Sequence, residues 1–122
     1  MGITNSNKLE LRMLGIDPGL QRTGWGVVTQ SGVRLSHIAH GTINTKTSWS
    51  MADRLQEIHS GLIEVITNWK PNDASIEQIF VAKGPESAIK LGMARGVAMQ
   101  TCAEKGLSLA EISARQVKKS VT

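Results

Sequence analysis

The sequence changes its hydrophobic period near residue 50, and this change limits the possible folds more than any other feature. Before it, short apolar segments at residues 11–16, 24–29 and 33–43 are separated by turn residues, which is typical of strands. After it, apolar residues recur at three- and four-residue steps, the spacing of a helix with one buried face. These residues are Met51, Leu55, Ile58, Leu62, Val65, Ile66 and Trp69. The pattern predicts an antiparallel meander of three strands followed by a helix.

The second half of the chain alternates between strand and helix. Residues 74–80 return to strand character, residues 85 to about 104 are predicted to be helical, and residues 107–112 form a fifth strand. Ser113 would open a last helix. Such an order predicts an α/β fold, a mixed sheet with helices on both faces.

Helix ends are also readable in the sequence. Ser50 with Asp53 resembles an N-terminal capping pair, and Lys70-Pro71-Asn72 should end the first helix. In the second helix, Gly92 and Gly96 each cost about 1 kcal/mol relative to alanine. We therefore expect a closely packed neighbouring helix or strand at these glycines.

Composition fits one globular domain. The chain has 122 residues, 40% of them hydrophobic and 20% charged. Residues 1–10 are predicted to be a disordered polar tail and residues 11–122 the folded domain. No apolar run suits a membrane span or a secretory signal, and the single cysteine, Cys102, excludes an internal disulfide and fits packing in a reducing compartment. The net charge of +4 mildly favours a polyanionic partner.

Two carboxylates stand within strand segments. Asp17 follows Leu14-Gly15-Ile16, and Glu77 lies inside Ser75-Ile76-Glu77-Gln78-Ile79. If the two strands are neighbours, both side chains can project into one cleft and bind Mg²⁺ or Mn²⁺ for phosphodiester hydrolysis. The alternative is structural: Asp17 caps a turn, and Glu77 points to solvent from an edge strand.

The three histidines do not suggest a site. His37, His40 and His59 lack the spacing of zinc ligands, and structural roles are expected for them. His37 and His40 are three residues apart in a strand, so their side chains should face opposite sides of the sheet.

Four blocks of sequence resemble the RuvC family of Holliday-junction resolvases in family order. They are residues 14–28, which include Leu14-Gly15-Ile16-Asp17-Pro18-Gly19; residues 71–80; residues 87–98; and residues 114–119. The resemblance implies a ribonuclease H-like fold and a homodimeric, Mg²⁺-dependent nuclease that nicks four-way DNA junctions. It also implies two metal ions in the complete site, a RuvA–RuvB branch-migration complex as partner, and the bacterial cytoplasm as location.

The resemblance assigns roles to individual residues. Asp17 and Glu77 would be two of four metal-binding acids. Phe80 would stack at the junction, although as the only phenylalanine it could instead belong to the core. Lys83, Lys90 and Lys118 match basic positions near phosphates.

The sequence departs from the family pattern in two places. Gly84-Pro85-Glu86 replaces a segment that often begins with asparagine, and it adds an acid close to the expected path of DNA. The family also continues into a final helix that carries the other two metal-binding groups. We therefore expect a C-terminally truncated domain with little or no cleavage activity in this 122-residue form.

Other functions fit less well. The actin-like kinases and chaperone ATPases share a Gly-x-Asp-x-Gly opening, but they need a second phosphate loop and a longer chain. The YqgF-like nucleases open similarly, yet the Glu-Gln-x-Phe strand and the residues 90–96 favour RuvC. A dimer that binds junctions without cutting them stays open as an alternative.

Overall fold

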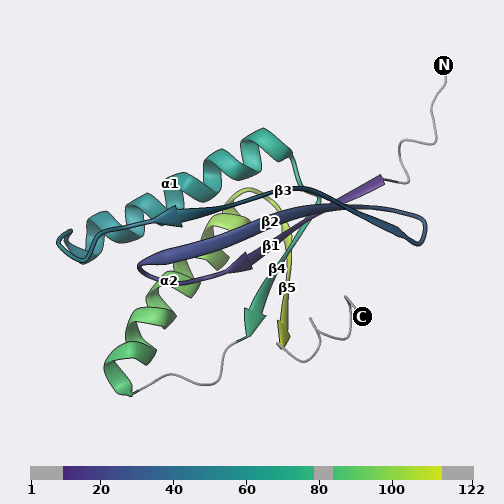
Figure 1. The fold of residues 1–122 in the computed structure, drawn as a ribbon. Coiled ribbons are helices and arrows are strands. Elements are labelled where there is room, and N and C mark those ends of the chain that lie inside the picture. Colours follow the sequence, from purple (N-terminus) through teal and green to yellow (C-terminus); the bar gives the residue numbers. More distant parts are fainter. Residues whose placement is uncertain (1–9, 79–83, 114–122) are drawn as a thin grey trace.

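The computed structural model describes residues 10–78 and 84–113 (Figure 1). Its elements, in chain order, are β1 (Glu10–Asp17), β2 (Arg22–Ser31), β3 (Arg34–Asn44), α1 (Met51–Trp69), β4 (Asp73–Gln78), α2 (Pro85–Glu104) and β5 (Ser108–Ser113). Glu10, at the end of the predicted tail, pairs with Ser31 as the first residue of β1. The rest of the predicted tail and the helix predicted after Ser113 lie outside the described residues.

The five strands form one mixed sheet in the order β3-β2-β1-β4-β5. β2 pairs antiparallel with both β1 and β3, as expected of a meander with short turns. β4 runs parallel to β1 and to β5, and α1 and α2 provide the long connections that parallel strands need. The predicted mixed sheet is therefore confirmed, and β1 lies at its centre.

Helix α1 follows the apolar stripe seen in the sequence. The side chain of Ser50 accepts a hydrogen bond from the Asp53 backbone N–H at 3.1 Å, which confirms the predicted cap. Lys70 ends the helix in the left-handed conformation, with φ of 48°. The stripe buries Ile58, Leu62, Val65 and Ile66. Within residues 10–78 and 84–113, neither helix has the length and apolarity needed to cross a membrane.

Helix α2 begins at Pro85 and is followed by Gly106 with φ of 77°. It buries small residues, Ala94, Ala98 and Cys102, against the sheet and α1. Cys102 is a packed free thiol, as predicted. A Cβ added at Gly92 or Gly96 would meet nothing within 4 Å, so the expected close neighbour is not found among residues 10–78 and 84–113.

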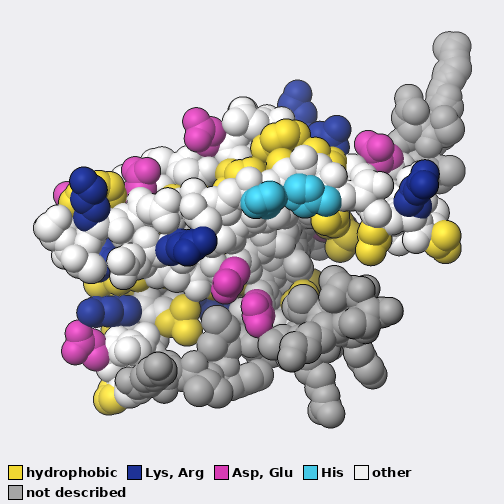
Figure 2. All heavy atoms as spheres, in the orientation of Figure 1, with side chains coloured by type: hydrophobic (Ala, Val, Ile, Leu, Met, Phe, Trp, Pro, Cys, Tyr) yellow, Lys and Arg dark blue, Asp and Glu magenta, His cyan; other side chains and the backbone are white. Residues whose placement is uncertain are grey.

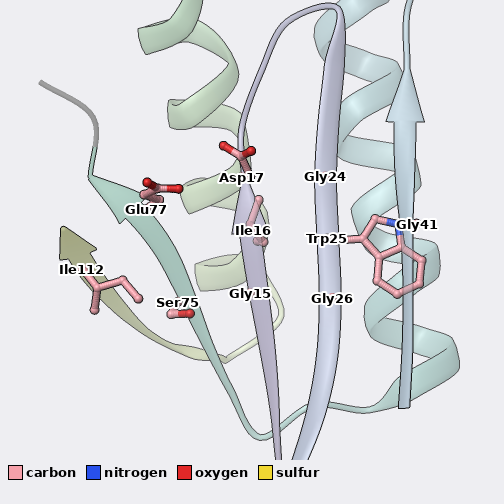
Figure 3. Close-up of a pocket in the computed structure, with 10 residues that line it drawn as sticks. All are labelled: Gly15, Ile16, Asp17, Gly24, Trp25, Gly26, Gly41, Ser75, Glu77 and Ile112. Carbon is pink, nitrogen blue, oxygen red and sulfur yellow. The ribbon is translucent and has the colours of Figure 1, made fainter. Parts of the chain in front are cut away.

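The strands alternate between two different faces. Leu14, Ile16, Val27 and Ile76 point toward α1 and α2 and are at most 4% exposed. In Figure 3 both helices lie behind the strands, on this covered face. Of the residues that the structure describes, none belongs to a helix on the opposite face, which we call the open face; the helix predicted there falls on the residues that are not described.

A β-bulge in β3 overturns the expectation for two histidines. The register places Ala39 opposite Val27 but His37 opposite Val28, so Ile38 is the extra residue. Ile38 packs against the core, and His37 and His40 both emerge on the open face. The Nε2 atom of His37 lies 3.0 Å from the Nδ1 atom of His40. The predicted opposite orientation assumed unbroken alternation, which the bulge interrupts.

Candidate active site

Asp17 is the last residue of β1, and the turn that follows holds it in place. A Cβ at Gly19 would lie 2.4 Å from the backbone oxygen of Arg22, so the turn is tight enough to require glycine. The buried hydroxyl of Thr23 donates a hydrogen bond to the Gly19 carbonyl at 2.8 Å. Asp17 itself is exposed on the open face.

Two buried polar residues fix the far side of the same turn. The Thr45 hydroxyl donates to the Leu20 carbonyl at 2.6 Å, and the Thr45 N–H donates to the Gln21 carbonyl at 3.0 Å. Arg54 of α1 donates from its Nε atom to the Thr45 hydroxyl oxygen at 3.0 Å. The turn after Asp17 is therefore joined to α1 as well as to β3, which limits how far the carboxylate can move.

Glu77 lies one strand away from Asp17. The register pairs Ile16 with Ile76, so the acids that follow them stand next to each other at the carboxyl ends of two parallel strands. Both side chains leave the sheet on the open face, and the Glu77 carboxylate points toward Asp17 (Figure 3). The two acids therefore converge, as the hypothesis of a shared cleft predicted. The alternative, in which Asp17 caps a turn and Glu77 points to solvent, did not require this. The acid pair is the central feature of the site.

The two acids line an open cleft of about 390 Å³. Its floor includes three glycines, Gly15, Gly24 and Gly26, which leave the backbone of β1 and β2 uncovered. Ser75 and Ile112 add a hydroxyl and an apolar side chain from β4 and β5. Such a floor lets a bulky substrate approach the carboxylates closely. Figure 2 views the molecule from another direction and shows acidic side chains (magenta) together near the middle of the molecule.

The charge of the site suits a hard cation. Among the ion pairs of the described residues, none involves Asp17 or Glu77. Adjacent carboxylates without a basic partner are typical ligands of Mg²⁺ and Mn²⁺, which prefer oxygen. Over residues 10–78 and 84–113 there is no group of three or more side chains suited to a metal. Two carboxylates fit one ion whose remaining ligands are water or substrate oxygens.

Of the predicted DNA contacts, only Lys90 falls among the described residues, and it does not line this cleft. Lys90 lies on the exposed side of α2, where its Nζ atom is 2.9 Å from a Glu86 carboxylate oxygen. The hydrogen bond and charge of Lys90 lower the pKa of Glu86. Phe80, Lys83 and Lys118 lie outside the described residues.

Sequence reasoning missed the glycine floor and Ser75. A signal was present, because Gly15 and Ser75 each stand two residues before an acid and therefore share its face. It also missed that His37 and His40 lie on the open face.

Comparison with known proteins identifies the family. Residues 13–122 match the family model of crossover junction endodeoxyribonuclease RuvC. The RuvC protein of Hyphomonas neptunium is 51% identical over 111 residues, which are 91% of this chain and 66% of that protein. The chain thus spans about two thirds of the length of this relative.

Solved structures give the same result. Thermus thermophilus RuvC in complex with a Holliday junction substrate superposes with a TM-score of 0.81 at 26% identity, covering 89% of this chain and 68% of that one. The yeast mitochondrial Holliday junction resolvase superposes with a TM-score of 0.62 at 17% identity, covering 84% of this chain and 50% of that one, a likeness of fold alone. These matches confirm the ribonuclease H-like architecture. The chain belongs to the RuvC family of crossover junction endodeoxyribonucleases.

Proposed function

We propose that this chain forms the catalytic sheet of a Holliday-junction resolvase, an endonuclease that nicks four-way DNA junctions in recombination and repair. The observation that carries the proposal is the pair Asp17 and Glu77, adjacent on an open face in a chain of the RuvC family. The cleft is open enough to receive a DNA strand, and its acids have the chemistry to bind a metal there.

The proposed reaction is metal-assisted phosphodiester hydrolysis. Asp17 and Glu77 would hold Mg²⁺, with Mn²⁺ as a substitute, and the complete site would hold two ions. When bound, the metal would activate water and stabilise the leaving oxygen. The protein positions the carboxylates through the Gly19 turn and the β1–β4 register, and the glycine floor allows the phosphate to come within reach of them.

Further contacts with the junction follow from the family resemblance. Phe80 would stack on an unpaired base, and Lys83, Lys90 and Lys118 would contact phosphates. For Lys90 this requires exchange of its pair with Glu86, which is undemanding because exposed ion pairs contribute little.

We also propose that the chain acts as a homodimer, with RuvA–RuvB as the expected partner complex. Support for the dimer comes from α2, where Ile89 is 60% and Met93 is 41% exposed beside Gly92 and Gly96. An apolar surface of this kind often associates with a second copy. A single species of monomer mass in sedimentation at micromolar concentration would contradict this part of the proposal.

The first test is cleavage of a synthetic four-way junction against linear duplex, with and without Mg²⁺. It compares residues 1–122 with a version extended through the last helix of the family. We expect the extended chain to nick the junction symmetrically and residues 1–122 to bind it with little cleavage. Asp17→Asn in the extended chain should lower the cleavage rate by at least about 100-fold, because a metal ligand is lost.

The same assay distinguishes the remaining alternatives. Junction binding without cleavage by both chains would favour the non-catalytic dimer. Equal affinity for junction and duplex would contradict the resolvase proposal and favour another nucleic-acid substrate, as for a YqgF-like nuclease.

A further inference from the structure

The open face continues beyond the acidic cleft onto β2 and β3, where its polar side chains are hydrogen-bond donors and not carboxylates. Strand alternation and the bulge at Ile38 place five polar side chains on this part of the face: Arg22, His37, His40, Thr42 and Asn44. We call them the donor row. All five are exposed, and each can donate at least one hydrogen bond.

The two strands of this region, β2 and β3, carry positive charge and no negative charge. Neither β2 nor β3 contains an aspartate or glutamate, whereas Arg22 is permanently cationic. Two carboxylates, Glu57 and Glu64, approach the edge of β3 from α1, where they line a groove with Thr42 and Asn44. They border the donor row on the covered side. On the open face, the acids Asp17 and Glu77 belong to β1 and β4 and not to the strands of the donor row.

Hydrogen bonds within the row leave donors available. One proton is shared between the paired nitrogens of His37 and His40, so in the neutral pair the ring that accepts it keeps its other N–H free to donate, and the second nitrogen of the donating ring is an acceptor. The Asn44 side-chain amide donates to the Thr42 hydroxyl oxygen at 3.1 Å, so the hydroxyl hydrogen of Thr42 is still free to donate. Figure 2 shows the histidine side chains (cyan) side by side on the surface.

The donor row is aligned with the cleft. Thr42 pairs with Gly24, and Gly24 pairs with Asp17, so Thr42 and Asp17 occupy one line across three strands. Two strand spacings separate them by roughly 10 Å. Only Gly24 lies between them, and Gly26 lies on the parallel line between His40 and Gly15, so no side chain of β2 rises above the sheet at these two positions.

We propose that the donor row binds the phosphodiester backbone of the DNA strand that enters the Asp17–Glu77 cleft. A row of donors with one fixed positive charge and no carboxylate is complementary to a chain of phosphates. The row thereby positions the strand from the β3 side, opposite to the β4–β5 side. The inference rests on the proposed function, because the strand is the substrate of the cleft.

The test measures binding of residues 1–122 to a four-way junction in EDTA, so that no metal held by imidazoles or carboxylates contributes. Arg22→Ala should weaken binding about 10-fold and reduce the slope of log affinity against log salt by about 1. The matched control is Arg34→Ala, which removes the same charge at the hairpin end of β3, where alternation directs the side chain away from the open face.

The histidines are tested by two double variants. His37→Ala with His40→Ala should weaken binding several-fold, whereas His37→Gln with His40→Gln should retain most of it, because glutamine still donates hydrogen bonds. Since these side chains are exposed, circular dichroism melting should show all variants folded.

The outcomes separate this inference from the proposed function. If the parent chain binds the junction in preference to duplex, but Arg22→Ala and the alanine double variant bind as tightly as Arg34→Ala, the donor row is not a DNA contact and the resolvase proposal stands. If the parent shows no preference for the junction, both proposals are contradicted.

Discussion

The two faces of the sheet are made by the same strands, yet one face forms the core and the other forms the cleft. On the covered face, Leu14 and Ile76 are completely buried beneath α1 and α2. On the open face, their neighbours Gly15 and Glu77 line a cleft. Because side chains alternate, each strand contributes to both faces. The comparison indicates that stability and chemistry can be changed separately, by substitutions one residue apart.

The largest effect on stability is expected from Ile76→Ala. Removing a fully buried isoleucine should lower the free energy of unfolding by about 2–5 kcal/mol. Glu77→Gln, at the next position, should leave it within about 0.5 kcal/mol, because the side chain is partly exposed and has no ion pair among the described residues. Urea denaturation measures both. A loss of more than 2 kcal/mol in Glu77→Gln would show that the open face also carries stability.

A smaller effect is expected from Gly61→Ala, which tests how closely α1 packs on the covered face. The added Cβ would lie 2.8 Å from the Cδ1 and Cγ1 atoms of Ile43. Overpacking should outweigh the gain in helix propensity and cost about 1 kcal/mol net. Ile43→Val should partly restore stability in the double variant, because it removes Cδ1.

Gly96→Ala is the matched control on α2, where open space surrounds the glycine. It should stabilise the monomer by up to about 1 kcal/mol, since only the propensity gain remains. Thermal melting of both glycine variants at low protein concentration makes the comparison. Destabilisation by Gly96→Ala would show that a second copy packs against this position.

The last effect concerns pH and belongs to the covered face alone. Burial raises the pKa of the Cys102 thiol to about 11, from an ordinary value of 9.0. In the unfolded chain the thiol loses its proton first, so its contribution to stability is complete below pH 9 and is lost as the pH rises toward 11.

Cys102→Ala provides the comparison for this prediction. It should remove the part of the decline in unfolding free energy between pH 9 and pH 11 that comes from the thiol. Identical pH profiles for the two proteins would show that the thiol is accessible to water in the folded state.

The sequence predicted most of the framework and the convergence of two acids on one cleft. The change of period identified α1 together with its cap at Ser50, and the lone acids in two apolar strands identified Asp17 and Glu77. These features are local, or follow from strand alternation. The orientation of His37 could not be predicted, because the bulge at Ile38 is defined by its pairing with β2. The surroundings of Gly92 and Gly96 depend on which face of α2 packs against the sheet. The low helix propensity of glycine, from which a close neighbour was predicted, contains no information about that face.

The parallel pairing of β1 with β4 has a consequence for the order of folding. The β1–β2–β3 meander joins residues close in sequence, whereas Asp17 and Glu77 meet only when segments 60 residues apart have paired. Loop closure makes such distant pairing slow, so we expect the hairpins to form first and the acid pair to assemble late.

A divalent ion that binds the assembled pair should therefore slow unfolding and leave the refolding rate unchanged. Stopped-flow measurements with and without Mg²⁺ would show this as a shift of the unfolding limb alone. Acceleration of refolding by the ion would place the pairing of β1 with β4 before the rate-limiting step.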